Sequence, residues 1–273
     1  MRKSGLITTQ PILKKNTVRS YQFTKNNFCE RFGEMEIVDL TPEAILKFLN
    51  ELTLNNKPYT KRVRFAQLTA FFNFIRNNID DSFNNPCEAP MIQKLFREKT
   101  SSRFDIIEKE TIDEIIFRTT DVRNRLILEL MARGGMRIGE VLKLTMMDIE
   151  GRKLVLREPK SGKEFESVFI PRRVADRLRI YASKTCDKPD DPIFPLSYES
   201  ARRMVSKSGK MVGIQLRPHD LRRHSATYAS RSGVPIEIVS KVILRHANLS
   251  TTQRYLGTIS DDEAKRWIEQ IYR

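Results

Sequence analysis

The sequence contains little cysteine, and its three cysteines lie far apart. Cys29, Cys87 and Cys186 form an odd set without a Cys-x-x-Cys pair. Closely spaced cysteines supply the usual thiolate ligands of zinc, so this spacing argues against a zinc site and indicates a reducing compartment. We expect the three side chains to occupy small buried or half-buried positions.

Long apolar runs, a nucleotide-binding loop and a carboxylate cluster are also missing. No stretch approaches the roughly 18 apolar residues of a membrane span, the initial Met-Arg-Lys-Ser-Gly does not begin a hydrophobic signal core, and the motif Gly-x4-Gly-Lys-Ser/Thr does not occur. The densest acidic group is Asp187, Asp190 and Asp191, which Pro189 interrupts. It is typical of a solvated loop, whereas a metal-dependent nuclease needs carboxylates clustered around divalent ions.

The sequence does have a large excess of positive charge. Its 273 residues include 49 Lys and Arg against 34 Asp and Glu, which gives a net charge of +15, and both halves of the chain share the excess. An excess of this size favours a polyanionic partner, most simply nucleic acid. Together with the absences above, it predicts a cytoplasmic, nucleoid-associated protein.

The first hundred residues predict an all-helical DNA-binding module. We expect a flexible basic arm over residues 1–15 and a helical domain over 16–100. Thr41-Pro42-Glu43 marks a helix start, because Thr caps helices, Pro fits the first turn and an acidic residue suits the positive end of the helix dipole. The helices are expected at 17–32, from the Thr41 cap to about 52, at 60–78 and at 89–99.

The third of these helices combines a basic beginning with an apolar stripe. Phosphate contacts supply most of the non-specific affinity for DNA, so we predict that Lys61, Arg62 and Arg64 bind DNA; a plain solvated face is the alternative. The stripe has helical spacing and is more typical of a core than of a base-stacking platform. It consists of Phe65, Leu68, Phe71, Phe72 and Ile75.

A polar segment at residues 100–103 separates this module from a larger domain, which we place at 104–273. Gly134-Gly135 ends a helix and Arg137 begins the next, where free backbone N–H groups favour an anion. Two short runs, 153–157 and 165–170, predict a β-hairpin with Lys160 at its turn-rich tip. The remaining helices are expected at 108–118, 121–133, 171–186, 198–211, from His219, from Pro235 and at 261–272. The predicted fold class is mainly α with a small β-hairpin or sheet.

Four groups near the end of the chain carry reactive chemistry. His219 and Arg222 lie three residues apart, so on a helix they share a face and can present donors to one anion. His246 follows, and Tyr255 comes nine residues after it. Histidine and arginine suit a phosphate, and a tyrosine hydroxyl can act as a nucleophile, so the stretch indicates phosphoryl transfer. Taken singly, a His-x-x-Arg pair is common on solvated helix faces, and such a tyrosine is usually a half-buried aromatic.

In their order and setting, six residues resemble the catalytic set of the tyrosine site-specific recombinases, the phage integrase and Xer family. The helical N-terminal module resembles the core-binding domain of that family. The resemblance implies a helical domain and an α+β catalytic domain that form a C-shaped clamp on double-stranded DNA with paired binding sites. The six residues are Arg137, Lys160, His219, Arg222, His246 and Tyr255.

The resemblance also implies a reaction. Tyr255 attacks a phosphodiester to give a 3′-phosphotyrosyl link and a free 5′-hydroxyl, and strands are exchanged through a Holliday junction in a synaptic tetramer, without metal, nucleotide or other cofactor. A phenol of ordinary pKa, about 10, is a weak nucleophile at neutral pH, so it needs cationic surroundings.

The same resemblance assigns roles to the other members of the set. Arg137 and Arg222 would hold the non-bridging oxygens, and Lys160 would protonate the leaving 5′ oxygen. His219 would assist proton movement at the tyrosine, and His246 would donate to a phosphate oxygen.

The neighbours of the catalytic set allow more than one interpretation. We expect Lys163, a second hairpin lysine, and Arg223 to bind DNA, and His224 to pack. Arg245 stands where many relatives have glycine. Tyr228 and Tyr272 are rival hydroxyls, but neither has the spacing from His246 that the family pattern requires.

The last helix, at about 261–272, resembles the family segment that docks on a neighbouring protomer. Packing on its own domain is the alternative. The side chains expected to make the contact are Trp267, Ile268 and Ile271.

The function predicted from these residues is site-specific DNA recombination of the integrase or Xer type. The alternative is a catalytically silent accessory or regulatory DNA-binding protein on the same fold. Plain DNA binding does not require a tyrosine at this spacing, which favours the enzyme. The chain does not separate chromosome dimer resolution from integration or excision of a mobile element.

Overall fold

The computed structural model describes residues 15–96, 106–157, 164–253, 255–256 and 261–271. The chain divides into two units, Met1–Ser102 and Arg103–Arg273, and each is described by itself. No helix in the described ranges is both long enough and apolar enough to cross a membrane.

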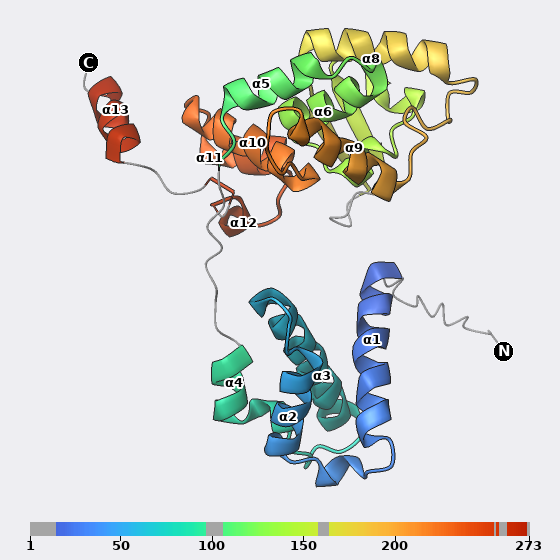
Figure 1. The fold of residues 1–273 in the computed structure, drawn as a ribbon, viewed down its shortest axis with the longest axis vertical. Helices are drawn as coiled ribbons and strands as arrows, with labels where there is room; N and C mark the ends of the chain where they lie inside the picture. Colours follow the sequence, from blue (N-terminus) through green and yellow to red (C-terminus); the bar gives the residue numbers. More distant parts are fainter. Residues whose placement is uncertain (1–14, 97–105, 158–163, 254, 257–260, 272–273) are drawn as a thin grey trace, which may run out of the picture. The chain divides into compact units, whose positions relative to one another are not determined.

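The N-terminal unit consists of helices joined by short turns (Figure 1). The Thr41 hydroxyl accepts a hydrogen bond of 3.3 Å from the N–H of Ala44, so the predicted cap is present. Residues 97–99, predicted as the end of the fourth helix, lie outside the described ranges. The elements are α1 Lys15–Phe32, η1 Ile37–Asp39, α2 Pro42–Leu52, α3 Pro58–Asn78, η2 Pro86–Glu88 and α4 Pro90–Phe96.

Aromatic rings fill the core of this unit. Phe28 on α1 contacts Phe48 on α2 and Phe72 on α3 edge to face, with ring centroids 5.9 Å apart in both pairs. Edge-to-face pairs are favourable beyond the burial of their area. Phe65 and Phe72 of the predicted stripe are buried, whereas Phe71 is 40% exposed at its edge. Apart from Phe71, the stripe is therefore core, as the helical spacing predicts.

The C-terminal unit combines helices with one small sheet (Figure 1). In chain order its elements are α5 Lys109–Arg118, α6 Val122–Gly134, α7 Ile138–Val141, η3 Met146–Asp148, β1 Ile149–Glu150, β2 Lys153–Arg157, β3 Phe165–Phe169, α8 Arg172–Thr185, α9 Tyr198–Lys210, α10 Pro218–Arg231, α11 Ile236–Ile238, η4 Val239–Ile243, α12 Leu249–Gln253 and α13 Asp261–Ile271. The predicted class, mainly α with a small sheet, is confirmed.

The sheet is antiparallel in the order β1-β2-β3. Leu154 pairs with Val168 and Leu156 with Glu166, and all four side chains are buried because alternate positions of a strand share a face. Glu166 therefore places a carboxylate at an inward, otherwise apolar position, and such a group needs a cationic partner. The predicted hairpin tip, with Lys160 and Lys163, lies outside the described ranges.

Helix α10 brings the His-x-x-Arg pair to the site. Pro218 occupies its first position, and the Asp220 carboxylate accepts a hydrogen bond of 2.9 Å from the N–H of Arg217, which satisfies a free donor at the helix start. Leu221 is fully buried in the core that residues of α6 also form, and Ala226 is buried with Val239 and Leu244.

The segment after Pro235 differs from the single helix that the sequence predicts. After three residues in α11, the chain widens into the π-helical turn η4, in which the N–H of Leu244 donates to the carbonyl of Val239 at 2.9 Å. A π turn bonds residues five apart instead of four, and such turns occur often at functional sites. Apolar periodicity does not distinguish one wide turn from an ordinary helix.

Candidate active site

Arg137 is positioned by the sharp end of α6. Gly135 has a φ of 61°, and a Cβ there would lie 2.8 Å from the carbonyl oxygen of Ile243, so only glycine permits this approach. Arg137 then caps α7: Glu140 accepts from its backbone N–H at 2.8 Å and from its Nη1 at 2.5 Å. Glu140 thus holds both the backbone and the side chain of the first predicted catalytic residue.

Arg222 is buried at the centre of the site, with 1% of its surface exposed. Its Nη1 and Nη2 donate to the carbonyl oxygens of Gly135 and Leu244, which ties α10 to the end of α6 and to the turn after η4. Burial, followed by the charges of Arg137 and Arg245, lowers the pKa of Arg222 to about 9, so it remains a cation at neutral pH. Of its five N–H groups, the carbonyls use two, which leaves donors for a further anion.

His246 and Tyr255 lie next to each other. Their ring centroids are 5.1 Å apart in an edge-to-face arrangement. The Nδ1 atom of His246 lies 3.0 Å from the hydroxyl of Thr252, and that hydroxyl donates to Ser240 at 2.9 Å. Thr227 on α10 donates to the carbonyl of Tyr255 at 3.0 Å. Hydrogen bonds from α10, η4 and α12 therefore hold the backbone of Tyr255 and the ring of His246.

His219 lies in the first turn of α10, three residues before Arg222. Its pKa is lowered, first because the surrounding protein limits the hydration of its ring and then because Arg222, Arg137 and Arg223 repel a further proton, while Asp220 acts in the opposite direction. The structure therefore brings five of the six predicted catalytic residues into one electrostatic neighbourhood. The sixth, Lys160, lies outside the described ranges.

Residues 105–260, more than half of the chain, match the model of the phage integrase family. The chain belongs to the phage integrase family. It is a tyrosine recombinase, an enzyme of site-specific DNA recombination.

Related proteins and solved structures agree with this assignment. The tyrosine recombinase XerA of Pyrococcus furiosus is 30% identical to the recombinase over 258 residues, which cover 88% of this chain and 83% of that protein. XerA of Pyrococcus horikoshii is 28% identical, with coverages of 88% and 82%. The transposon Tn1549 integrase, solved with transposon right-end DNA, has the same fold, with a TM-score of 0.74, 16% identity and coverages of 96% and 95%.

Several residues that the sequence interpretation missed support the recombinase site. Glu140 stands three residues after Arg137, and this capping-box spacing could have identified it. Ser240 and Thr252, which are buried and orient His246, carry no sequence signal, because their contact forms between segments twelve residues apart.

The predicted DNA-binding residues of α3 differ in their surroundings. Nη1 of Arg64 donates to the Ser20 backbone and hydroxyl, to Thr24 and to Gln67 at 2.9–3.1 Å, and its guanidinium lies over the ring of Phe23 at 4.4 Å. These contacts hold α1 against α3. By contrast, Arg62 is exposed and Lys61 is half-buried.

The residues after Arg222 lie at the edge of the site. Arg223 donates to Asp220 at 3.1 Å, and its guanidinium carbon is 5.9 Å from the centroid of the Tyr255 ring. His224 is buried with Nδ1 3.1 Å from the carbonyl of Ile107, and its ring stacks on Tyr228. Of the rival hydroxyls, Tyr228 is thus engaged in a separate ring stack, and Tyr272 lies outside the described ranges.

Helix α13 contacts its own unit through Trp267. A Cβ on Gly233 would lie 3.4 Å from Cη2 of Trp267, so the indole lies against Gly233, just after α10. Ile268 is 57% exposed. The side chain of Ile271 lies outside the described part of the structure.

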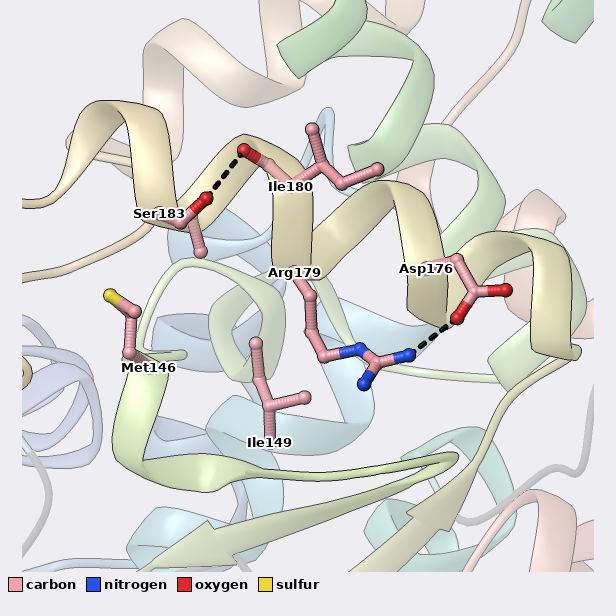
Figure 2. Close-up of a pocket in the computed structure, with 7 residues that line it drawn as sticks. Met146, Ile149, Asp176, Arg179, Ile180 and Ser183 are labelled. Carbon is pink, nitrogen blue, oxygen red and sulfur yellow. Dashed lines mark hydrogen bonds and ion pairs between the residues drawn. The ribbon is translucent and has the colours of Figure 1, made fainter.

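A separate cavity of about 660 Å³ lies between α8 and the η3–β1 segment (Figure 2). Its polar groups satisfy one another: Arg179 pairs with Asp176, and the Ser183 hydroxyl donates to the carbonyl of Ile180. Its lining includes no member of the catalytic set. Within the described ranges, no group of three or more His, Cys, Asp or Glu side chains is arranged to hold a metal ion.

We expect the binding of a phosphodiester to raise the pKa of His246. In the free protein this pKa is lowered to about 4, first by burial and then by the charges of Arg222, Arg137 and Arg245. The folded state therefore favours the neutral ring, so this contribution to stability is present above pH 6.5 and is lost as the pH falls toward 4. An anion among the arginines offsets their repulsion and favours the imidazolium.

The measurement is an NMR titration of the histidine rings with and without inorganic phosphate or a short uncleavable DNA. His224 is the control, because burial is the first cause of its lowered pKa and its ring bonds the carbonyl of Ile107 outside the catalytic set. A His246 pKa that does not move with either anion would show that the arginines do not form a phosphate site.

Proposed function

We propose that the recombinase cuts and rejoins DNA through Tyr255. The tyrosine oxygen attacks a phosphorus atom of the duplex, a P–O bond to the tyrosine forms, and the bond to the 5′ oxygen breaks. The free 5′-hydroxyl of a second duplex then attacks the phosphotyrosyl link and displaces the tyrosine. Each step exchanges one phosphodiester for another, and two rounds of exchange pass through a Holliday junction.

One observation carries this proposal: the rings of Tyr255 and His246 lie with their centroids 5.1 Å apart, in a site where burial and then the charges of the arginines lower the pKa of His219 and His246. Excess cationic charge beside a fixed hydroxyl stabilises a pentacoordinate phosphate, because the negative charge on the non-bridging oxygens increases in the transition state. A DNA-binding surface without chemistry does not require a buried arginine and a tyrosine packed against a histidine at one place.

The geometry supports distinct roles for the catalytic groups. Arg137 and the free N–H groups of Arg222 bind the non-bridging oxygens. Once the anion has bound, His246 is protonated: Nδ1 donates to Thr252, whose own hydrogen goes to Ser240, and Nε2 donates to a phosphate oxygen. His219 assists proton transfer from Tyr255, and Lys160 protonates the leaving 5′ oxygen.

We further propose that the substrate is double-stranded DNA with paired binding sites, in the nucleoid. The net charge of +15 and the transposon right-end DNA bound by the Tn1549 integrase support this. Lys61, Arg62, Lys163 and Arg223 are the proposed backbone contacts. Exchange takes place in a synaptic tetramer, and the exposed Ile268 of α13 supports a protomer contact by that helix.

The test is covalent trapping on DNA sites that the recombinase itself selects. Duplexes with a randomised inverted repeat are selected by binding, and the selected sequences are rebuilt with a nick, so that cleavage releases a short oligonucleotide that diffuses away. We expect a protein–DNA band that survives denaturation, forms in EDTA and yields a phosphotyrosyl peptide containing Tyr255. Tight binding with no covalent band would favour the catalytically silent alternative.

Arg62 and Arg64 provide a matched test of the DNA-binding surface. We expect Arg62→Ala to reduce the salt dependence of DNA binding by about one phosphate contact without lowering the melting temperature. We expect Arg64→Ala to reduce the free energy of unfolding by about 1–3 kcal/mol, because it leaves partners on α1 and α3 unsatisfied. Fluorescence anisotropy over a salt series and urea denaturation measure the two effects. If the salt dependence is the same in Arg62→Ala and the parent, Arg62 does not contact phosphate.

A further inference from the structure

Arg245 adopts a backbone conformation that glycine would adopt at less cost. Its φ of 53° makes it the one non-glycine residue in the described ranges with a positive φ. Its side chain is 4% exposed. A left-handed conformation and a buried guanidinium are both costly, so the surrounding contacts must compensate for them.

Those contacts join three segments of the catalytic unit. Nη2 of Arg245 donates to Glu140 on α7 at 2.7 Å, and Nε lies 3.4 Å from the carboxylate of Glu166 on β3. Nη1 donates to the carbonyl of Ile243 at 2.8 Å, at the end of η4. The guanidinium thus fills the space between the Arg137 turn, the inner face of the hairpin and the turn that leads to His246.

The two carboxylates depend on this arginine to different degrees. Glu140 also binds Arg137; burial raises the pKa of Glu140, but Arg245 and Arg137 outweigh that effect and hold it below its ordinary value. Glu166 is 6% exposed, and within the described ranges Arg245 is the cation paired with it. Without Arg245, strand β3 would carry an uncompensated buried charge.

We propose that Arg245 is a positioning residue of this recombinase. By binding Glu140, β3 and the turn before His246 together, it holds Glu140 in place, and through Glu140 it holds Arg137. The inference rests on the proposed function, because it takes Arg137 and His246 as phosphate ligands. The contacts of Arg245 assemble the anion site before DNA binds, so that little rearrangement is needed during cleavage.

The test compares Arg245→Gly, Glu166→Gln and the double variant with the parent. Glycine removes the backbone strain, so any loss in Arg245→Gly comes from the missing side chain and not from the left-handed conformation. We expect its cleavage rate constant at saturating suicide substrate to fall about 10- to 100-fold, as for a small displacement of catalytic groups, with little change in DNA affinity. Lys241→Ala, which removes a charge from the exposed side of η4, is the control and should cleave like the parent.

The double variant separates positioning from charge compensation. We expect Arg245→Gly to lower the melting temperature, because it leaves the carboxylate of Glu166 unpaired. The double variant Arg245→Gly/Glu166→Gln should recover the melting temperature of the parent, because that carboxylate is gone. It should not recover the cleavage rate, because Arg245 no longer holds Glu140 and Arg137 in place. Recovery of both together would overturn the positioning role, as would parental cleavage by Arg245→Gly.

Hydrogen exchange supplies a readout that does not depend on cleavage. In Arg245→Gly without DNA, we expect faster exchange of the amides of α7 and β3 than in the parent or in Lys241→Ala. Unchanged exchange would overturn the inference. If the parent forms no covalent complex, the proposed function fails, and the exchange experiment still decides whether Arg245 braces these segments.

Discussion

Tyr255→Phe is expected to abolish the covalent protein–DNA complex while leaving DNA binding intact. The substitution removes the attacking oxygen and keeps the ring, which packs against the buried cluster of Ala226, Val239 and Leu244. Loss of a nucleophile lowers the rate by at least about 10⁴-fold. The ring contact with His246 is retained, so the melting temperature should match that of the parent.

The measurement is the nicked-substrate assay on a denaturing gel, with a gel shift of the same samples under native conditions. Tyr228→Phe is the matched control, because it also removes one tyrosine hydroxyl, on the exposed Tyr228 of α10, and keeps a ring that stacks on His224. We expect this control to cleave normally. A covalent band that survives in Tyr255→Phe and disappears in Tyr228→Phe would mean that the nucleophile is the second tyrosine.

Arg222→Lys is expected to reduce cleavage strongly, although it conserves the charge. The guanidinium donates at once to the carbonyls of Gly135 and Leu244 and keeps further N–H groups for the phosphate. A lysine ammonium is a single point donor and cannot reproduce this planar arrangement. Loss of one such donor to a transition-state oxyanion costs about 10²- to 10³-fold in rate.

The same substitution should lower the free energy of unfolding by about 1–3 kcal/mol, because at least one buried carbonyl loses its hydrogen-bond donor. Cleavage is therefore measured in single turnover, well below the melting temperature and at saturating DNA. Arg231→Lys, in the last turn of the same helix, is the control for replacing arginine by lysine on α10. Parental cleavage by Arg222→Lys would show that Arg222 has only a structural role and that Arg137 alone binds the phosphate.

Much of the fold follows from local sequence. The Thr41 cap, the Gly135 helix end and the hairpin strands were predictable, because caps, glycine conformations and strand alternation depend on neighbouring residues. The order of Arg137, Arg222, His246 and Tyr255 likewise indicated the chemistry. The roles of Lys160 and Lys163 stay predictions.

Tertiary packing alone decided how the polar groups are used. Arg64, expected at the DNA, is bound between α1 and α3. Arg245, which stood out in sequence only as a departure from glycine, pairs with Glu140 across 105 positions of the chain. Local patterns show where a charged residue lies on its helix or strand, but the partner of a buried charge is fixed only when distant segments exclude water around it. The sequence therefore determined which residues could perform the reaction, and the packing determined which charges hold them in place.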